Sequence, residues 1–154
     1  MKLTVQTATL RDVDEVAPLF DLYRQFYQQP ADLPAARAFL AQRLEHNESA
    51  VFVARDEERR VVGFAQLYPL FCSVALKLQW LLYDLYVLPE ARRAGAARLL
   101  LERCKQLGVD TRSHALFLET ANDNLAAQRL YESAGWEREA KYVKYNLWLS
   151  GVHS

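Results

Sequence analysis

A short segment in the second half of the chain combines basic side chains with very small residues. Positions 92–97 read Arg-Arg-Ala-Gly-Ala-Ala, directly before a helical pattern. Small residues let a ligand approach the backbone closely, and the first N–H groups of a helix point outward at the positive end of its dipole. Arg92 and Arg93 add charge-assisted donors. The segment suits a pyrophosphate group, although the small residues could equally serve only to pack the helix while the arginines stay solvated.

Two carboxylates lie inside otherwise apolar runs. Asp84 falls within 78–87, and Glu119 falls within 115–120. A carboxylate inside a strand is unfavourable unless it is paired or faces water, so both are candidates for acid–base chemistry. The alternative is an ion pair with a basic side chain, or exposure at the end of a strand.

Patterns of period 2 and period 3.6 alternate along the chain, which is typical of a layered α/β or α+β domain. Alternating apolar runs predict strands over 3–7, 50–54, 61–68, 78–87 and 115–120, with one or two closing strands in 136–149. The runs 50–54 and 61–68 predict an antiparallel hairpin whose second strand ends at Pro69. Helical spacing predicts a first helix from Val13 to the break at Pro30. A second helix is predicted after Pro34, with Ala38, Phe39, Ala41 and Leu44 buried. A third predicted helix ends at Gly108, and a fourth covers 124–134.

Composition limits the class of protein. The length of 154 residues predicts one domain over 1–154, and 51% hydrophobic residues can fill one core. Nineteen Lys plus Arg balance nineteen Asp plus Glu, so no positive surplus indicates a nucleic-acid partner. No apolar run approaches the ~20 residues that cross a bilayer, and the N-terminus lacks a secretory signal, which predicts a cytoplasmic protein without membrane contact. Cys72 and Cys104 have no metal-binding spacing, and the three His are scattered, so we expect reduced thiols and no metal.

A second motif follows the predicted strand at 115–120. The pattern Asn124-x-x-Ala127-x-x-Leu130-Tyr131-x-x-x-Gly135-Trp136, together with Arg92-x-x-Gly95-x-Ala97, resembles the GNAT superfamily of N-acetyltransferases. The predicted order of elements also resembles the family layout from about Leu3 to Leu149. The resemblance implies an α/β (α+β) GNAT fold, with a mixed sheet of six to seven strands that splays at the cofactor cleft, flanked by about four helices. Tyr68-Pro69, Asp84 to Val87 and Ala126 to Tyr131 are similar to a branch of yeast histone and polyamine acetyltransferase-like proteins.

The resemblance implies acetyl-CoA as cosubstrate and no metal. The end of the strand before the basic segment would pair with the acetyl and pantetheine arm, and the segment itself would hold the pyrophosphate. The implied binding residues are Leu85, Tyr86, Val87, Arg92, Arg93, Ala94, Gly95, Ala96, Ala97, Asn124, Ala127 and Tyr131. Many family members carry Gly where this chain has Arg93, so the turn here is expected to be stiffer. Asn124 has a second interpretation as the N-cap of the last helix.

The family pattern also implies catalytic roles. Tyr131 matches the family tyrosine that protonates the departing thiolate. A phenol with a pKa near 10 keeps its proton at neutral pH and suits this role. The alternative is that the Tyr131 side chain only packs. An acceptor amine with a pKa of about 10.4 must lose a proton before it attacks. Asp84 is favoured slightly over Glu119 as the base, because it lies closer in sequence to the expected acetyl position, and an ordered water could relay the proton.

These features predict an acetyl-CoA-dependent N-acetyltransferase that acts by direct transfer to a primary amine of a small molecule or peptide. Neither cysteine has a paired His in these motifs, which disfavours a covalent acetyl-enzyme. The alternatives are a non-catalytic acyl-CoA-binding or sensor module, and a protein lysine acetyltransferase. The apolar, aromatic segment from Tyr142 to Leu149 could pair across a homodimer.

Overall fold

The structure is a computed structural model that describes residues 1–152. The chain divides into two compact units, Met1–Glu119 and a smaller one that begins at Thr120. The larger unit contains the whole sheet and three of the α-helices, and the smaller unit contains the fourth α-helix. No helix among the described residues is long and apolar enough to cross a membrane.

The sheet of the first unit has five strands in the order β1-β2-β3-β4-β5. The strands are β1 (Thr4–Thr7), β2 (Ala50–Arg55), β3 (Val61–Cys72), β4 (Lys77–Val87) and β5 (Leu116–Phe117). The first four pair in antiparallel fashion, and β5 runs parallel to β4. The mixed sheet and flanking helices confirm the predicted α/β architecture, although the described residues form five strands where six to seven were expected.

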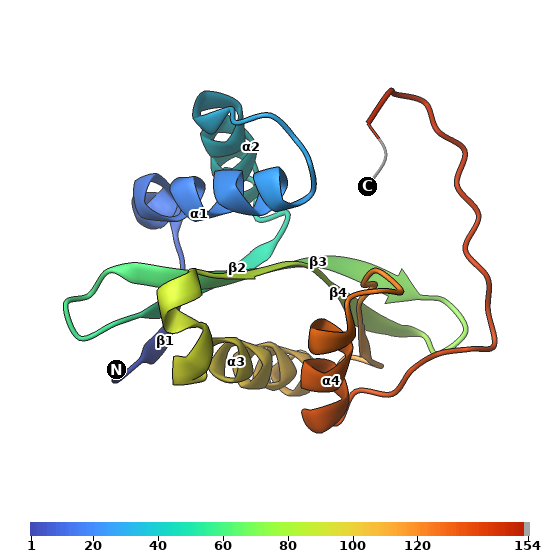
Figure 1. The fold of residues 1–154 in the computed structure, drawn as a ribbon. Helices are drawn as coiled ribbons and strands as arrows, with labels where there is room; N and C mark the ends of the chain where they lie inside the picture. Colours follow the sequence, from blue (N-terminus) through green and yellow to red (C-terminus); the bar gives the residue numbers. More distant parts are fainter. Residues whose placement is uncertain (153–154) are drawn as a thin grey trace. The chain divides into compact units, whose positions relative to one another are not determined.

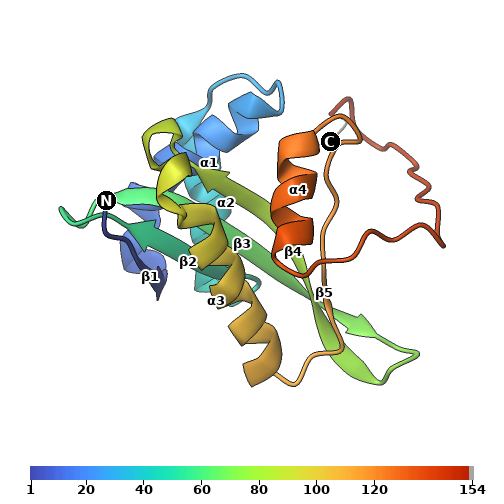
Figure 2. The ribbon, with the colours of Figure 1, turned by 60° about the horizontal axis from the view of Figure 1, so that its bottom comes forward.

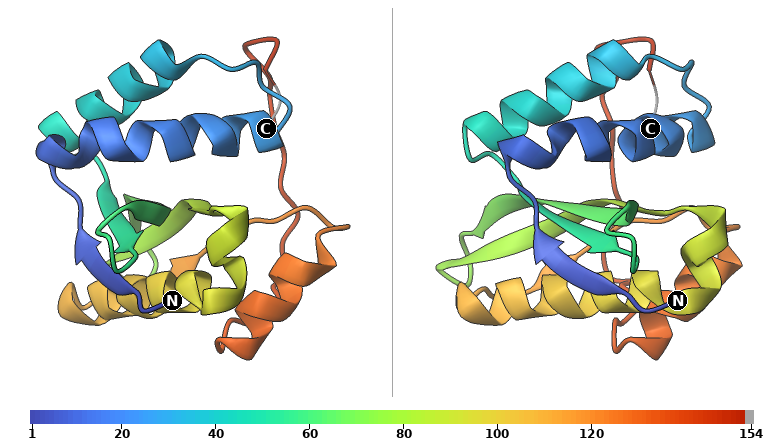
Figure 3. Two further views of the ribbon diagram at one scale, coloured as in Figure 1. Left: turned by 60° about the vertical axis from the view of Figure 1, so that its left-hand side comes forward. Right: turned by 90° about the vertical axis from the view of Figure 1, so that its left-hand side faces the viewer.

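Helices cover both faces of this sheet. Figure 3 shows α1 (Val13–Phe26) and α2 (Leu33–Glu45) on one face and α3 (Ala96–Asp110) on the other. Two short 3-10 helices, η1 (Leu10–Asp12) and η2 (Pro89–Ala94), lead into α1 and α3. Because both faces are covered, β2 and the first half of β3 are buried almost continuously. The apolar core between the sheet and the first two helices includes Val16, Phe20, Leu40, Val53 and Phe64.

Local sequence signals determine where the helices begin. Thr9 and Asp12 form the capping box that their spacing predicts. The side chain of Asp32 caps α2 by accepting a hydrogen bond from the N–H of Ala35 at 3.1 Å. The predicted buried face of α2 is confirmed in part, because Ala41 and Leu44 are half-buried and pack against the core. Ala38 and Phe39 are exposed, and the fully buried residues are Ala36 and Leu40.

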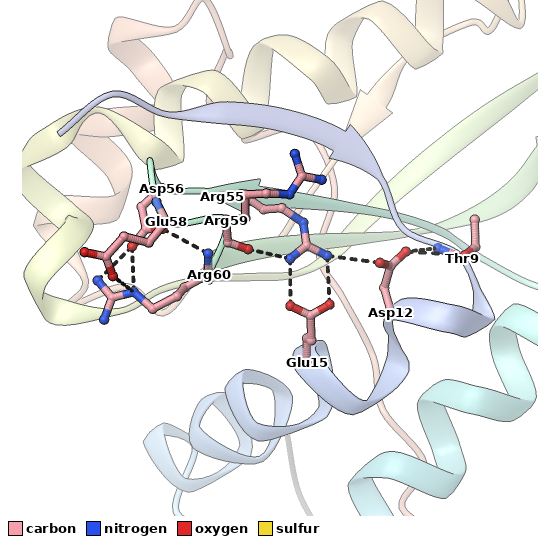
Figure 4. A network of polar contacts seen from close by, with 8 residues as sticks. All are labelled: Thr9, Asp12, Glu15, Arg55, Asp56, Glu58, Arg59 and Arg60. Atoms are coloured by element: carbon pink, nitrogen blue, oxygen red, sulfur yellow. Dashed lines mark hydrogen bonds and ion pairs between the residues drawn. The ribbon is translucent and has the colours of Figure 1, made fainter.

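A buried arginine connects the turn after β2 to the start of α1. The side chain of Arg55 is 6% exposed and donates to both carboxylate oxygens of Glu15, at 2.7 and 3.1 Å, and to Asp12 at 3.0 Å (Figure 4). The carbonyl of Arg59 accepts a further bond from Arg55 at 2.7 Å. Because Asp12 also accepts from the N–H of Thr9 at 2.7 Å, the cluster holds β2 and the capping box together. The bond from Arg55 lowers the pKa of Glu15 below its usual range.

Two strand predictions fail at their ends. Pro69 does not end β3, which continues to Cys72 with Pro69 opposite Trp80. A proline is tolerated there because β2 pairs with β3 only as far as Leu67, so the missing N–H falls where β3 has a strand on one side alone. Only Leu116–Phe117 of the predicted strand 115–120 pairs with β4 (Figure 2).

The second unit contains α4 (Leu125–Ser133), which is capped by Asn124 through a 3.2 Å bond from the N–H of Ala127. The helix ends at Gly135, whose φ of +91° lies in the left-handed region, and the N–H of Trp136 donates back to the carbonyl of Tyr131 at 3.0 Å. Residues 136–149 form no strand, so the expected closing strands are absent from the described structure.

Candidate active site

The C-terminal half of β4 has a strand neighbour on one side only within the first unit. Strand β5 pairs with β4 at Trp80 and Leu81, whereas β3 pairs with β4 through to Val87 (Figures 1 and 2). Residues 82–87 therefore have no strand partner on that side in the first unit, and the family resemblance implies the cofactor cleft at this edge. A strand edge of this kind can pair with an extended ligand through backbone hydrogen bonds. Leu85, Tyr86 and Val87, the predicted partners of the pantetheine arm, all lie in this stretch.

The turn that follows β4 leads directly to the start of α3. Gly95 is the N-cap of α3 and has a φ of +83°, a left-handed conformation that favours glycine. No N-cap side chain accepts a hydrogen bond from the first N–H groups of α3. A Cβ at Gly95 would meet nothing within 4 Å, which leaves open space in front of the helix. These features fit an anionic pyrophosphate group.

Arg92 joins this turn to the end of the strand. Its Nε donates to the carbonyl of Val87 at 3.0 Å, and its guanidinium lies 5.8 Å from the centre of the Tyr86 ring. Arg93 is exposed beside it. The structure thus brings the two basic side chains and the strand end into one local region, as their closeness in sequence requires. Ala96 is buried, and Ala94 and Ala97 are half-buried.

Asp84 is a buried carboxylate on the same strand. Its residue is 3% exposed and lies opposite Gln66 of β3, whose side-chain amide donates to Oδ2 at 2.8 Å. Burial raises the pKa of Asp84 to about 6, although hydrogen bonds from Gln66 and Tyr23 oppose the rise. The ion pairs of the described residues include no cation beside Asp84. A buried carboxyl without a cation, with a pKa close to neutrality, is suited to gain and lose a proton.

Tyrosine side chains surround Asp84. The hydroxyl of Tyr23 on α1 donates to the carbonyl of Tyr83 at 3.0 Å and also lies within hydrogen-bonding reach of Asp84. The rings of Tyr68 and Tyr83 meet edge to face at 5.7 Å. Burial and the neighbouring Asp84 carboxylate raise the pKa values of Tyr23 and Tyr68 above their usual range. Both therefore stay neutral near pH 7, which leaves Asp84 as the group here that can accept a proton.

Glu119 is placed differently from Asp84. It is exposed and follows β5 by two residues, so the expectation that it lies inside a strand is wrong. The short β5 explains the difference, because the chain leaves the sheet after Phe117. An exposed carboxylate experiences little desolvation, which removes the physical reason for which it became a candidate. Its role as a base stays a prediction.

The remaining predicted site residues, Asn124, Ala127 and Tyr131, belong to the second unit. Asn124 acts as the N-cap of α4, which confirms one of its two interpretations. Tyr131 is half-buried in the last turn of α4, with its ring centre 6.0 Å from that of Trp136. The roles of these residues toward acetyl-CoA stay predictions.

Sequence reasoning missed three residues around the end of β4. Gln66 is fully buried and bonds to Asp84, and Ser49 donates to Gln66 at 2.8 Å. A Cβ at Gly63 would approach the Val87 side chain to 3.1 Å and the Tyr86 carbonyl to 3.2 Å. A glutamine and a glycine inside the apolar run 61–68 were the available signals, because a polar side chain or a missing one in a buried strand needs a reason.

The cysteines give no support to a covalent mechanism. Cys72 and Cys104 are both free thiols. Burial raises the pKa of Cys104 to about 12, so this thiol stays protonated and is a poor nucleophile. Among the described residues, no group of three or more His, Cys, Asp or Glu could hold a metal ion.

Comparison with known proteins identifies the class to which this fold and site belong. The model of the Acetyltransferase (GNAT) family matches residues 16–136. The "Uncharacterized N-acetyltransferase YhfO" of Bacillus subtilis (strain 168) is 41% identical over 145 residues, which cover 94% of this chain and 97% of that protein. A "Probable acetyltransferase" of Haemophilus influenzae is 32% identical over 139 residues, covering 90% of this chain and 93% of that protein. The crystal structure of a probable acetyltransferase has a TM-score of 0.89 and 41% identity, covering 97% of this chain and 99% of that one.

These matches agree with the mixed sheet and its flanking helices. The chain belongs to the acetyltransferase (GNAT) family. The superfamily predicted from the two motifs is confirmed, while the narrower likeness to yeast histone and polyamine acetyltransferase-like proteins stays a prediction.

Proposed function

We propose that the protein transfers the acetyl group of acetyl-CoA directly to a primary amine of a small molecule or peptide. The observation that carries the proposal is Asp84, which is 3% exposed, has a pKa of about 6 and lies on the strand that leads to the basic turn. At pH 7 this carboxyl is mostly ionised, so it can take the proton that a protonated amine must lose before it attacks.

The residues around the end of β4 fit the donor. We assign the backbone of Leu85 to Val87 to the acetyl and pantetheine arm, and residues 92–97 to the pyrophosphate. When bound, acetyl-CoA supplies an activated thioester. Support comes from the φ of +83° at Gly95, the α3 N-terminus without a capping side chain, and the two arginines of the turn.

The second half of the proposal concerns the leaving group. We assign to Tyr131 the transfer of a proton to the CoA thiolate, and to Asn124 and Ala127 contacts with the pantetheine arm. The residues that the family model matches, 16–136, include all three positions. The same range continues from the first unit into the second, which favours a single acetyltransferase domain over 1–154.

Two alternatives predict different behaviour. A non-catalytic acyl-CoA-binding module needs the basic turn but has no use for a buried carboxyl without a cation, and Asp84 therefore favours an enzyme. A protein lysine acetyltransferase would use the same chemistry on a larger acceptor. The decisive experiment incubates the protein with acetyl-CoA and a panel of amines, polyamines, amino acids and peptides, and follows thiol release. Saturable release with one class of amine supports the proposal, and donor binding without release from any acceptor supports the binding module.

The basic turn can be tested by substitution at Gly95. We expect Gly95→Glu to weaken acetyl-CoA binding by at least about tenfold, because a carboxylate would occupy the open space before α3 and repel the pyrophosphate. Gly95→Ala is the matched control, since it introduces the same strain at a φ of +83° without charge or bulk. Isothermal titration calorimetry measures both affinities. Equal affinity of the Glu and Ala variants would remove the assignment of the pyrophosphate to this turn.

We also propose that the chain forms a homodimer through the segment from Tyr142 to Leu149. Tyr142, Val143, Tyr145, Leu147 and Leu149 are each at least 77% exposed in the single chain. An apolar stripe of this kind marks a surface for association. Light scattering at micromolar concentration is expected to give twice the monomer mass, and Val143→Lys combined with Leu147→Lys is expected to return it to one. A monomer mass for the unmodified protein would rule out the dimer at that concentration.

A further inference from the structure

We propose that Gln66 and Ser49 are positioning residues that hold Asp84 in its ionised form, ready to accept the proton of the amine. The inference rests on the proposed function, because it treats Asp84 as the base. It adds two residues that neither the motifs nor the family match single out.

A chain of two short hydrogen bonds links three elements of the first unit. The hydroxyl of Ser49, just before β2, donates to Oε1 of Gln66 on β3 at 2.8 Å. The Nε2 of Gln66 then donates to Oδ2 of Asp84 on β4 at 2.8 Å. Gln66 is 0% exposed, and its residue lies directly opposite Asp84 in the strand register. A glutamine in this position cannot exchange its partner for bulk water.

The direction of the chain matters because an amide has one donating and one accepting end. With the hydroxyl of Ser49 on its oxygen, Gln66 turns its N–H group toward Asp84, and an N–H donor stabilises a carboxylate over a carboxylic acid. The bond is made to Oδ2, and the chain of hydrogen bonds therefore favours the ionised form of Asp84.

The other titratable groups near Asp84 are tyrosines, of which Tyr23 also lowers the pKa of Asp84 through a hydrogen bond. Tyr23 approaches from α1, Tyr68 from β3 and Tyr83 from β4 itself. Burial raises the pKa values of Tyr23 and Tyr68, so both stay neutral while Asp84 titrates. The charges on Arg43 and Glu48 act on the Tyr68 hydroxyl.

Substitution of Gln66 tests the proposal without any acceptor. In Gln66→Met the side chain keeps a similar size but loses the N–H donor, and we expect the pKa of Asp84 to rise by about one to two units. Carbon-13 NMR of the aspartate carboxyls, titrated between pH 4 and 9, measures this shift directly, and the resonance absent from Asp84→Asn identifies Asp84. Gln79→Met makes the same chemical change elsewhere on β4, opposite Leu70, and is the matched control.

Substitution of Ser49 tests the outer link and does not open the core. Ser49→Ala is expected to shift the pKa of Asp84 in the same direction by a smaller amount, whereas Ser49→Thr, which keeps the hydroxyl, is expected to restore it. The Ser49 pair gives the result even if Gln66→Met fails to fold. An unchanged pKa of Asp84 in Gln66→Met and Ser49→Ala overturns the proposal.

Kinetics separate this inference from the function on which it rests. If Asp84 is the base, the acid limb of kcat/KM moves to higher pH in Gln66→Met in parallel with the NMR shift, while the rate at high pH recovers. If the NMR shift occurs but the kinetic profile does not move, Gln66 still controls Asp84 and the assignment of Asp84 as the base is wrong. A lowered rate at every pH with no NMR shift would indicate a merely structural role and would overturn the proposal.

Discussion

Asp84→Asn is expected to lower kcat at pH 7 by about 10² to 10⁴, because the amide keeps the shape of the side chain but cannot accept the proton of the incoming amine. In the wild type, kcat/KM should rise with pH through about 6, the pKa to which burial raises Asp84, and level off above it. The variant should lose this limb. At a pH high enough to deprotonate the free amine, the two rates should converge, since the base is no longer needed.

Stability shows whether this loss of rate comes from damage to the fold. The pKa of Asp84 is higher in the folded chain than the 3.8 of an exposed carboxyl, so the native state binds more protons between about pH 4 and 6. The free energy of unfolding therefore falls as pH rises through this window, and the cost of the buried charge persists above it. Asp84→Asn removes that cost, and urea unfolding should find the variant at least as stable as the wild type at pH 8 and similar to it at pH 4.

Glu119→Gln is the paired test for the other carboxylate. Because Glu119 is exposed, we expect the pH–rate profile of the Glu119→Gln variant to follow that of the wild type. A loss of the acid limb in Glu119→Gln but not in Asp84→Asn would transfer the role of base to Glu119. If neither variant alters the profile, the proton leaves directly to solvent and both assignments are wrong.

The parts of the molecule that the sequence predicted well are those with strong local signals. Thr9 and Asp12 mark the entry to the first helical segment, and the alternation in 50–54 and 61–68 gives the hairpin. The small residues at 94–97 anticipate the left-handed Gly95 and the start of α3. Asp84 could be singled out because an acidic residue in a buried run has few tolerable environments. Each of these features depends on neighbours in sequence.

The parts that sequence reasoning missed depend on partners distant in the chain. The link between Ser49, Gln66 and Asp84 spans three elements, and only the β3–β4 register brings Gln66 opposite Asp84. The buried face of α2 was predicted only in part, because Leu33–Glu45 has small residues on several sides and its pattern did not single out Ala36 and Leu40 as the buried positions. The continuation of β3 through Pro69 depends on where β2 begins, because Ala50 at the start of β2 is the residue opposite Leu67, and no local pattern shows this.

Tyr131→Phe is expected to lower turnover by about 10² to 10⁴, mainly in kcat, while the affinity for CoA changes little. The substitution removes one hydroxyl and keeps the ring, so the contact of Tyr131 with the Trp136 ring at 6.0 Å can persist. If that hydroxyl gives its proton to the departing thiolate, the thiolate must leave without protonation in the variant. Steady-state thiol release with the identified acceptor measures kcat, and calorimetry with CoA measures binding.

Tyr27→Phe is the matched control for this prediction, because it makes the same chemical change at an exposed tyrosine of the first unit, outside the proposed dimer segment. Its turnover should equal that of the wild type. Since a poor leaving group depends most on an acid, a donor with a more acidic thiol should recover part of the rate in Tyr131→Phe but gain little in the wild type. If Tyr131→Phe turned over as fast as the wild type, Tyr131 would have only a packing role. An equal loss for both donors would instead show that the hydroxyl positions the thioester and does not protonate the thiolate.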